Sequence, residues 1–258
     1  MRRLILEEVN SSAALWSRRL AVLAVAITGF GLAFGRFGYA DLTSAVAVVS
    51  FAMFLACFAI VIAAFACIHI WREGVNGAKI TFFAVSLSLA LLVWPGYLAV
   101  KSFELPRLND ISTDIDQPPL FSPEPRRVAA RGGFSPGALA PLTRVLQPRF
   151  YPQVQPLTLE VESFEVFDAT QKVLKGLGWK ILDVTAPIPS RADGQIEATT
   201  SSLLMGVPYN IKIRIRPMGD ITRVDTRSLS RFGAHDYGKN AELILRFNKA
   251  LQAEMDAR

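Results

Sequence analysis

The residues best suited to chemistry lie close together near the end of the chain. Two arginines, Arg227 and Arg231, are followed by the adjacent pair His235 and Asp236. Guanidinium groups bind carboxylates and phosphates through paired hydrogen bonds, and a helix that begins at Asp236 adds partial positive charge, so this corner predicts an anion site. The competing interpretation is structural: Asp236 caps the helix and an arginine pairs with it. The sequence favours this second account.

An enzyme at this corner is the weaker expectation. His235 and Asp236 are neighbours in sequence, so their side chains point apart, and the C-terminal half contains no other histidine. No serine or cysteine nucleophile motif accompanies them. We therefore expect no catalytic residue and favour a non-enzymatic protein. The alternative is a small-ligand carrier or enzyme that uses Arg227, Arg231, His235 and Asp236.

A second group of charged residues follows the alternation of two predicted strands. Along residues 209–216, isoleucines at every second position alternate with basic residues, so the basic side chains share one face of the strand. Residues 221–230, the hairpin partner, add more charges to that outer face. The pattern predicts a charged sheet face presented to an envelope protein, an anionic lipid headgroup or a glycan. The candidate binding residues of the face and the corner are Lys212, Arg214, Arg216, Arg223, Arg227, Arg231, Asp236 and Asn240.

Metal and cofactor sites are not expected. Asp110, Asp114 and Asp116 could attract Ca²⁺, but their spacing fits no EF-hand loop and the glycine that such a loop requires is missing. Both cysteines, Cys57 and Cys67, lie in an apolar run and leave none for a disulfide or a metal site in the polar half. We expect no metal and no cofactor.

The distribution of charge argues against nucleic acid as a partner. Residues 1–155 carry 14 Lys and Arg against 9 Asp and Glu, whereas residues 156–258 carry 14 against 13. A folded domain that binds nucleic acid is expected to show a basic stripe, and this half of the chain is nearly neutral.

The chain falls into two halves, an apolar half suited to the lipid bilayer and a polar half suited to water. Three apolar runs are long enough to cross the ~30 Å hydrocarbon core of a bilayer as helices. The predicted spans are residues 20–37, 45–70 and 80–100, after a leader at residues 1–19. Gly31 and Gly35 share a face of the first span. They indicate either a close helix contact or only the general frequency of glycine in membrane helices.

The basic residues near the spans predict their orientation. The leader and the loop after the second span hold six Lys and Arg, whereas the first loop and the exit from the third span hold three. By the positive-inside rule, the N-terminus is expected in the cytoplasm. Three spans then place the C-terminal half on the other side of a multi-pass inner membrane, in the periplasm of a Gram-negative cell.

The polar half begins with a linker and ends with a folded domain. Residues 104–155 are rich in proline, glycine and arginine and predict no regular helix or strand of any length; docked and disordered linkers both fit. Residues 156–258 predict an α+β domain in the order β-α-β-β-β-β-α, a mainly antiparallel sheet with both helices on one face. The predicted strands are 157–161, 179–186, 194–201, 209–216 and 221–230, with a helix capped by Ser163 and a last helix over 236–255.

Several short motifs of the polar half resemble a known family. They are Asn109-Asp110-Ile111-Ser112-Thr113-Asp114, Pro118-Pro119, Tyr151-Pro152, Arg227-Ser228-Leu229-Ser230-Arg231 and Gly233-Ala234-His235-Asp236-Tyr237-Gly238-Lys239-Asn240. Together they resemble the bacterial proteins grouped as domain of unknown function 1499, and the three-span half is similar to a variant common in alphaproteobacteria. The resemblance implies a membrane-anchored protein of the cell envelope and brings no activity with it.

Overall fold

The computed structural model describes residues 11–39, 41–188 and 192–257. The first ten residues of the predicted leader lie outside these ranges. The described chain forms two compact units. The first contains the helices up to Val100 together with residues 203–206, and the second contains residues 101–202 and 207–257.

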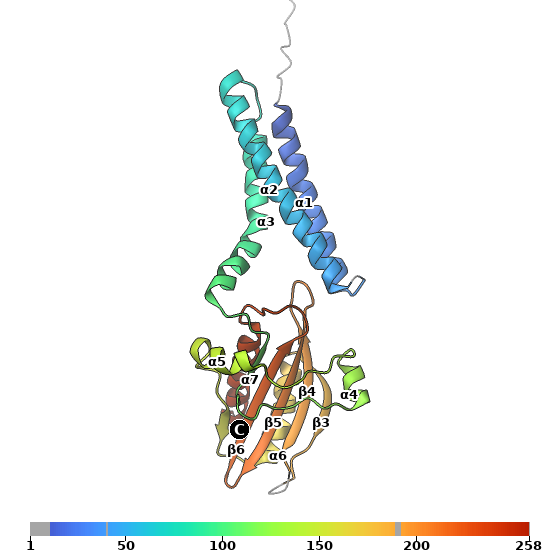
Figure 1. The fold of residues 1–258 in the computed structure, drawn as a ribbon, viewed down its shortest axis with the longest axis vertical. Helices are drawn as coiled ribbons and strands as arrows, with labels where there is room; N and C mark the ends of the chain where they lie inside the picture. The colour runs from blue at the N-terminus through green and yellow to red at the C-terminus, as the bar shows by residue number, and fades with distance from the viewer. Residues whose placement is uncertain (1–10, 40, 189–191, 258) are drawn as a thin grey trace, which may run out of the picture. The chain divides into compact units, whose positions relative to one another are not determined.

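The first unit consists of long apolar helices (Figure 1). They are α1 (Ser12–Arg36), α2 (Leu42–Glu73) and α3 (Ala78–Glu104). All three are long and apolar enough to cross a membrane, as the sequence predicts. The first helix begins at Ser12 rather than near residue 20, so Arg18 and Arg19 lie within it and not in a separate leader.

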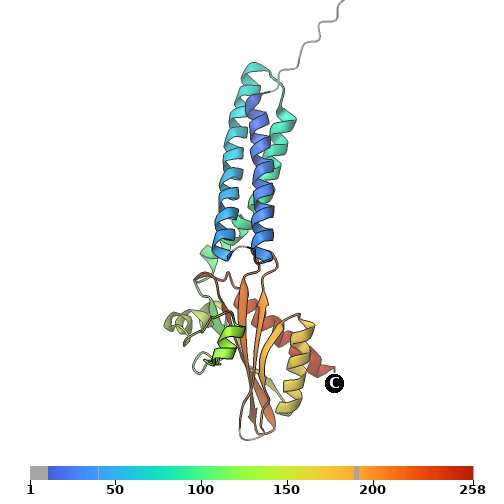
Figure 2. The same cartoon turned by 90° about the vertical axis from the view of Figure 1, so that its right-hand side faces the viewer.

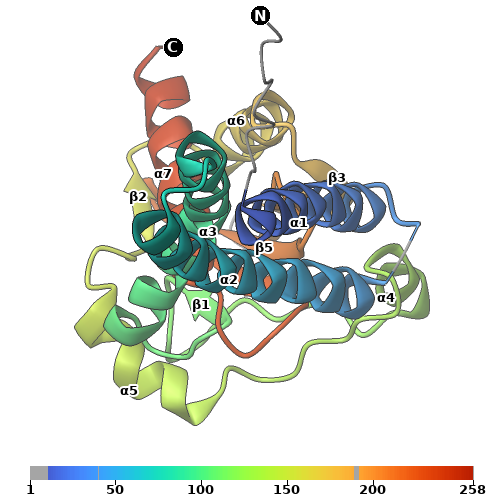
Figure 3. The same cartoon turned by 90° about the horizontal axis from the view of Figure 1, so that it is seen from above.

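Small residues fill the contacts between these helices. The buried residues of α2 are six alanines, whereas large apolar side chains such as Phe54 and Phe65 face outward. α1 and α2 lie side by side (Figure 3). A Cβ added at Gly35 would lie 2.9 Å from the Cβ of Ala45, and one at Gly31 would lie 3.0 Å from Val49. The two glycines therefore mark a close helix contact.

The second unit is an antiparallel sheet with helices. Its elements are β1 (Asp110–Ser112), α4 (Pro125–Ala130), α5 (Pro141–Phe150), β2 (Leu157–Leu159), α6 (Ser163–Gly176), β3 (Lys180–Thr185), β4 (Gly194–Ser201), β5 (Pro208–Met218), β6 (Ile221–Ser230) and α7 (Lys239–Asp256). The six-stranded sheet has the order β1-β6-β5-β4-β3, and β2 also pairs with β6. Every pairing is antiparallel, which confirms the predicted fold class.

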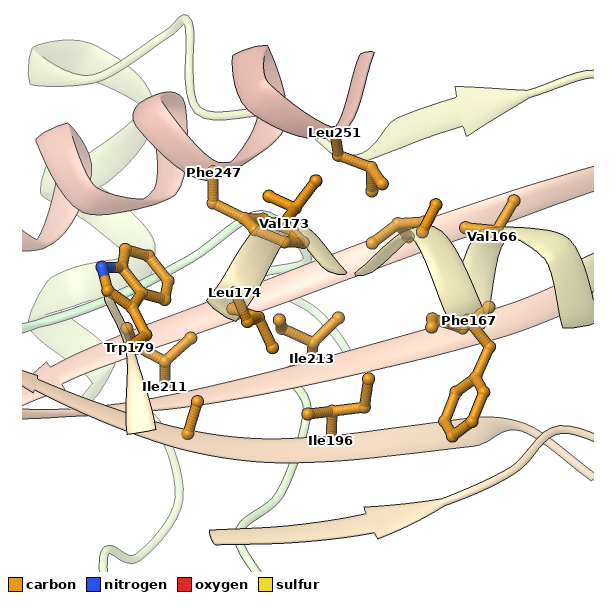
Figure 4. Packing of buried hydrophobic residues seen from close by; sticks show 14 of the residues in the cluster. Val166, Phe167, Val173, Leu174, Trp179, Ile196, Ile211, Ile213, Phe247 and Leu251 are labelled. Carbon is orange, nitrogen blue, oxygen red and sulfur yellow. The ribbon is translucent and has the colours of Figure 1, made fainter. Parts of the chain in front are cut away.

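The main core lies between the sheet and the two long helices of this unit. Figure 4 shows Ile211 and Ile213 of β5 beneath Val173 and Leu174 of α6, with Phe247 of α7 beside them. The strand side chains alternate, and the isoleucines of β5 are fully buried on this face. The predicted packing of both helices on one face is thus confirmed.

The opposite face of the sheet, here called the outer face, is covered by the chain's own residues. Residues 113–150, here called the covering segment, include α4 and α5 and lie across the sheet from α6 and α7 (Figure 2). The predicted linker is therefore docked and forms part of the second unit, so the domain boundary predicted at residue 156 is too late. It also contains short regular elements that its prolines were expected to forbid. Two of these prolines, Pro125 and Pro141, each begin a helix, where no amide N–H is needed.

The two predicted helix caps differ from the structure. Glu162, not Ser163, occupies the N-cap position of α6, and Ser163 begins the helix. The N-cap position of α7 belongs to Gly238, whose φ of 81° suits glycine. The Asp236 carboxylate nevertheless accepts hydrogen bonds from the N–H groups of Gly238 (3.0 Å) and Asn240 (2.7 Å), so it still serves the start of the helix.

Candidate functional site

The charged outer face is an internal layer and not an exposed surface. Lys212 is 1% exposed and Arg227 is 0% exposed, because the covering segment lies over them. The expectation that this row of residues is presented to a partner is therefore wrong for its central members. Two arginines stay partly exposed: Arg216, near the end of β5, and Arg223, near the start of β6. A buried charge is tolerated only with close partners, and the layer supplies them.

Glu197 of β4 forms the centre of one ionic cluster. Its carboxylate pairs with the guanidinium of Arg131 and accepts hydrogen bonds from Lys212 Nζ (3.1 Å) and the N–H of Ser122 (2.9 Å). Burial alone would raise the pKa of Glu197, but the Ser122 N–H and the charges of Lys212 and Arg131 outweigh it, so the pKa is lowered. Burial lowers the pKa of Lys212, and Glu197 only partly offsets this effect. In this cluster two buried cations share the one buried carboxylate of Glu197.

Asp225 and Asp114 form a second cluster with two arginines. Arg214 Nη2 lies 2.7 Å from Asp225 Oδ2 and 3.0 Å from Asp114 Oδ2. Arg223 reaches the same two aspartates, at 2.8 Å and 3.1 Å. Asp225 comes from the sheet and Asp114 from the covering segment, so the cluster ties the two together.

Arg227 anchors the covering segment most firmly. Its guanidinium donates to both carboxylate oxygens of Asp110, at 2.9 Å and 2.6 Å, and to the carbonyl oxygens of Pro119 and Gly137. The ring of Phe121 lies 5.5 Å from this guanidinium and 5.5 Å from that of Arg131. The arginine that the sequence suggests for ligand binding is thus engaged by the protein itself.

The corner before α7 is also engaged internally. Arg231 Nη1 donates to the carbonyl oxygen of Arg131 at 2.5 Å, and His235 Nδ1 accepts from the N–H of Tyr237. Among the described residues Asp236 forms an ion pair with neither Arg227 nor Arg231, so the predicted pairing of one of these arginines with Asp236 is wrong. Burial raises the pKa of Asp236, against the lowering effect of those N–H groups.

Asn240 connects the corner to the sheet. Its Oδ1 accepts from the hydroxyl of Ser228 at 2.8 Å, and its Nδ2 donates to the carbonyl oxygen of Asn109 at 2.8 Å. The side chain is fully buried. It holds the start of α7 against β6 and the entry to β1, which is a structural role.

One edge of the outer face opens into a cavity of about 490 Å³. Its charged lining consists of Asp116, Arg144, Asp193, Lys212 and Arg214. Lys212 and Arg214 are paired within the ionic layer, and Asp193 lies 3.4 Å from Arg216. Arg144 of α5 is exposed and has no hydrogen-bond or ion-pair partner among the residues that the structure describes. The cavity therefore places one free guanidinium beside two engaged cations.

Three residues of this site were not foreseen: Arg131, Arg144 and Glu197. Glu197 had a signal, because it alternates with the inward Ile196 and Ala198 and lies opposite Lys212 in the antiparallel register. For Arg131 and Arg144 no sequence pattern gives such a signal, because irregular chain determines where they lie relative to the sheet. In the described ranges no group of three or more metal-ligating side chains comes together.

Comparison with known proteins identifies a family and a solved structure of low sequence identity. The crystal structure of CalU16 from Micromonospora echinospora is 11% identical over 39% of this chain and 83% of that chain, with a TM-score of 0.20. A search of curated proteins finds no match. The family described as protein of unknown function (DUF1499) matches residues 110–251, which begin at β1, include the covering segment and reach into α7. Because this match spans more than half of the chain, the protein belongs to the DUF1499 family.

Proposed function

We propose that the protein is a membrane-anchored, non-enzymatic binding module of the cell envelope. The helices α1, α2 and α3 supply the anchor: their outward faces are large and apolar, and their mutual contacts are made by alanine and glycine. A soluble helical unit would show the reverse arrangement, with large apolar residues inside. The second unit supplies the binding function.

The orientation proposed for the anchor follows from its flanking charges. Six Lys and Arg in the leader and second loop against three in the first loop and exit favour a cytoplasmic N-terminus, with the second unit in the periplasm. Alkaline phosphatase, which needs disulfides, should then be active when fused after Arg107 and inactive when fused after Glu73. Phosphatase activity on colonies measures this, with immunoblots to equalise expression. Activity only after Glu73 would reverse the proposed orientation.

The ligand that the cavity suits best is a small anionic group, such as a phosphate or carboxylate on an envelope lipid headgroup or glycan. The observation that carries this proposal is the free guanidinium of Arg144 beside Lys212 and Arg214 in a cavity of about 490 Å³. Cavities of this size commonly hold small molecules, and arginine forks match planar and tetrahedral oxyanions. The alternative site around Arg227, Arg231, His235 and Asp236 is disfavoured, because Arg227 and Asp236 bind the protein's own groups and the atoms left without a partner, Arg231 Nε and His235 Nε2, are buried.

Arg144→Ala tests this proposal. Isothermal titration of the full chain in detergent micelles with inorganic phosphate and with succinate should show binding by the wild type and an affinity at least tenfold lower in the variant. The reason is that a hydrogen bond to a charged group contributes about 1.5–3 kcal/mol. Lys175→Ala, which removes an exposed cation from α6, is the matched control and should bind like the wild type. Equal affinity of Arg144→Ala and the wild type would exclude this cavity as the anion site.

A further inference from the structure

A groove of about 600 Å³ lies on the second unit, at the end of α3 and beside the first turns of α7. Its apolar surface comes from Leu105, Phe150 and Leu245, which pack against a small core beneath the groove. Its polar rim comes from Lys101, Glu104, Glu242, Arg246 and Lys249. The groove therefore combines an apolar surface with a rim that carries three cations and two carboxylates.

Tyr151 lines this groove and carries a hydroxyl that is itself buried. The side chain is 5% exposed, and its hydroxyl has no hydrogen-bond partner among the described residues. Burial, and then the charge of Asp236, raise the pKa of Tyr151 to about 12, so the hydroxyl keeps its proton at neutral pH. Buried polar groups are almost always paired, and an orphan beside a groove indicates a missing partner.

Two cations of the rim are free to meet an anion. Arg246 and Lys249 are exposed, lie three residues apart on α7 and so share a face, and have no ion-pair partner in the described ranges. Of the two carboxylates, Glu242 is engaged by Lys239 Nζ at 2.5 Å. The part of the rim that belongs to α7 therefore has a net positive charge.

The sequence connects this groove directly to the third proposed span. Lys101 and Glu104 belong to the last turn of α3, a helix that the proposed anchor function inserts in the bilayer. Trp94 and Tyr97 precede that turn, at positions typical of interfacial aromatic residues. Phe103 in the same turn is 90% exposed. The groove wall therefore includes the residues that directly follow the proposed span in the sequence.

We propose that this groove binds an anionic phospholipid of the bilayer that carries the spans. The lipid phosphate lies between Arg246 and Lys249 and accepts from the Tyr151 hydroxyl, and the upper part of an acyl chain contacts Leu105, Phe150 and Leu245. The site is distinct from the Arg144 cavity. It rests on the proposed membrane anchoring but not on the proposed ligand of that cavity.

The test uses the full chain in nanodiscs of phosphatidylcholine that contain a photo-crosslinkable phosphatidylglycerol. After irradiation, peptides from the groove of the wild type should carry the lipid. Arg246→Ala/Lys249→Ala should lower this labelling tenfold or more, and the isosteric Tyr151→Phe should lower it severalfold without disturbing the fold. Lys175→Ala/Lys180→Ala removes two exposed cations elsewhere on the same unit and should leave labelling unchanged.

The possible failures of this test differ from one another. Equal labelling of the groove in the wild type and both groove variants would overturn the lipid site, as would labelling confined to α1, α2 and α3. Equal labelling by a neutral photo-crosslinkable diacylglycerol would also overturn it, because the proposal requires the phosphate. Failure of the wild type to enter nanodiscs would instead refute the membrane anchoring on which the site rests.

Discussion

Replacing Glu197 with glutamine is expected to lower the free energy of unfolding of the second unit by about 3–5 kcal/mol. The substitution keeps the size of the side chain but leaves the charges of Arg131 and Lys212 buried without a counter-ion, which is costly. Urea unfolding in detergent micelles, followed by the emission of Trp179 with the other three tryptophans replaced by phenylalanine, measures the change. A shift of the urea midpoint by roughly 2 M is expected.

Two controls separate this effect from a general loss of an acidic residue. Glu165→Gln removes an exposed carboxylate from α6 and should change stability by less than about 0.5 kcal/mol. The double variant Glu197→Gln/Lys212→Met should lose less than the sum of the two single variants, because it removes one of the stranded charges. Additive losses, or a wild-type midpoint for Glu197→Gln, would contradict the ionic layer as described.

The same cluster predicts a dependence on pH. The pKa of Glu197 is lowered below its ordinary value of 4.5, so its carboxylate contributes stability that is present above pH 4.5 and is lost as the pH falls through the folded pKa. Glutamine cannot take part in this loss. The difference in unfolding free energy between the wild type and Glu197→Gln should therefore be largest above pH 4.5 and shrink in more acidic solution.

The sequence predicted those parts of the fold that depend on local pattern. The strands at 194–201 and 221–230 match the structure at both ends, because strict alternation and turn residues set their limits. The alternation of residues 211–216 also assigned the isoleucines to the core and the basic residues to the other face. A period of two residues fixes which face a side chain occupies, and this information is entirely local.

What covers that other face could not be predicted in the same way. Asp110 and Asp114 meet Arg227 and Arg214 across more than 95 residues of chain, and no local pattern links them. The strand β1 is only three residues long and has no alternation, so its pairing with β6 is visible only in three dimensions. The prolines of the covering segment suggested irregular chain, but they do not indicate whether irregular chain docks.

This covering explains why so many basic residues of the second unit are unavailable to a partner. The sheet carries Lys212, Arg214 and Arg227 in a row. Their carboxylate partners are Glu197 of β4, Asp110 of β1 and Asp114 of the covering segment, which also supplies carbonyl groups to Arg227. The binding that we propose uses cations outside the ionic layer, namely Arg144 at one cavity and Arg246 with Lys249 at the groove. The candidate ligand sites are therefore identified by cations without a partner, and not by the cations that are paired within the ionic layer.

Replacing Asp110 with alanine is expected to release part of the covering segment. Arg227 would stay buried with carbonyl partners but no carboxylate, at a cost of about 3–5 kcal/mol. Movement of Arg227 toward water would relieve this cost. Because the same guanidinium binds the carbonyl groups of Pro119 and Gly137, that movement should free the chain between them. Limited digestion with trypsin of the full chain in micelles should then cut after Arg126, Arg127 and Arg131 at least tenfold faster than in the wild type.

Two further variants decide whether the ion pair itself is responsible. Asp116→Ala removes an exposed carboxylate from the same segment and should be digested at the wild-type rate. Arg227→Met removes the guanidinium together with its hydrogen bonds to Pro119 and Gly137, and should be digested at least as fast as Asp110→Ala if Arg227 holds the segment. If the single variant resists trypsin as well as the wild type does, the covering segment is held by its other contacts and Arg227 is not its anchor.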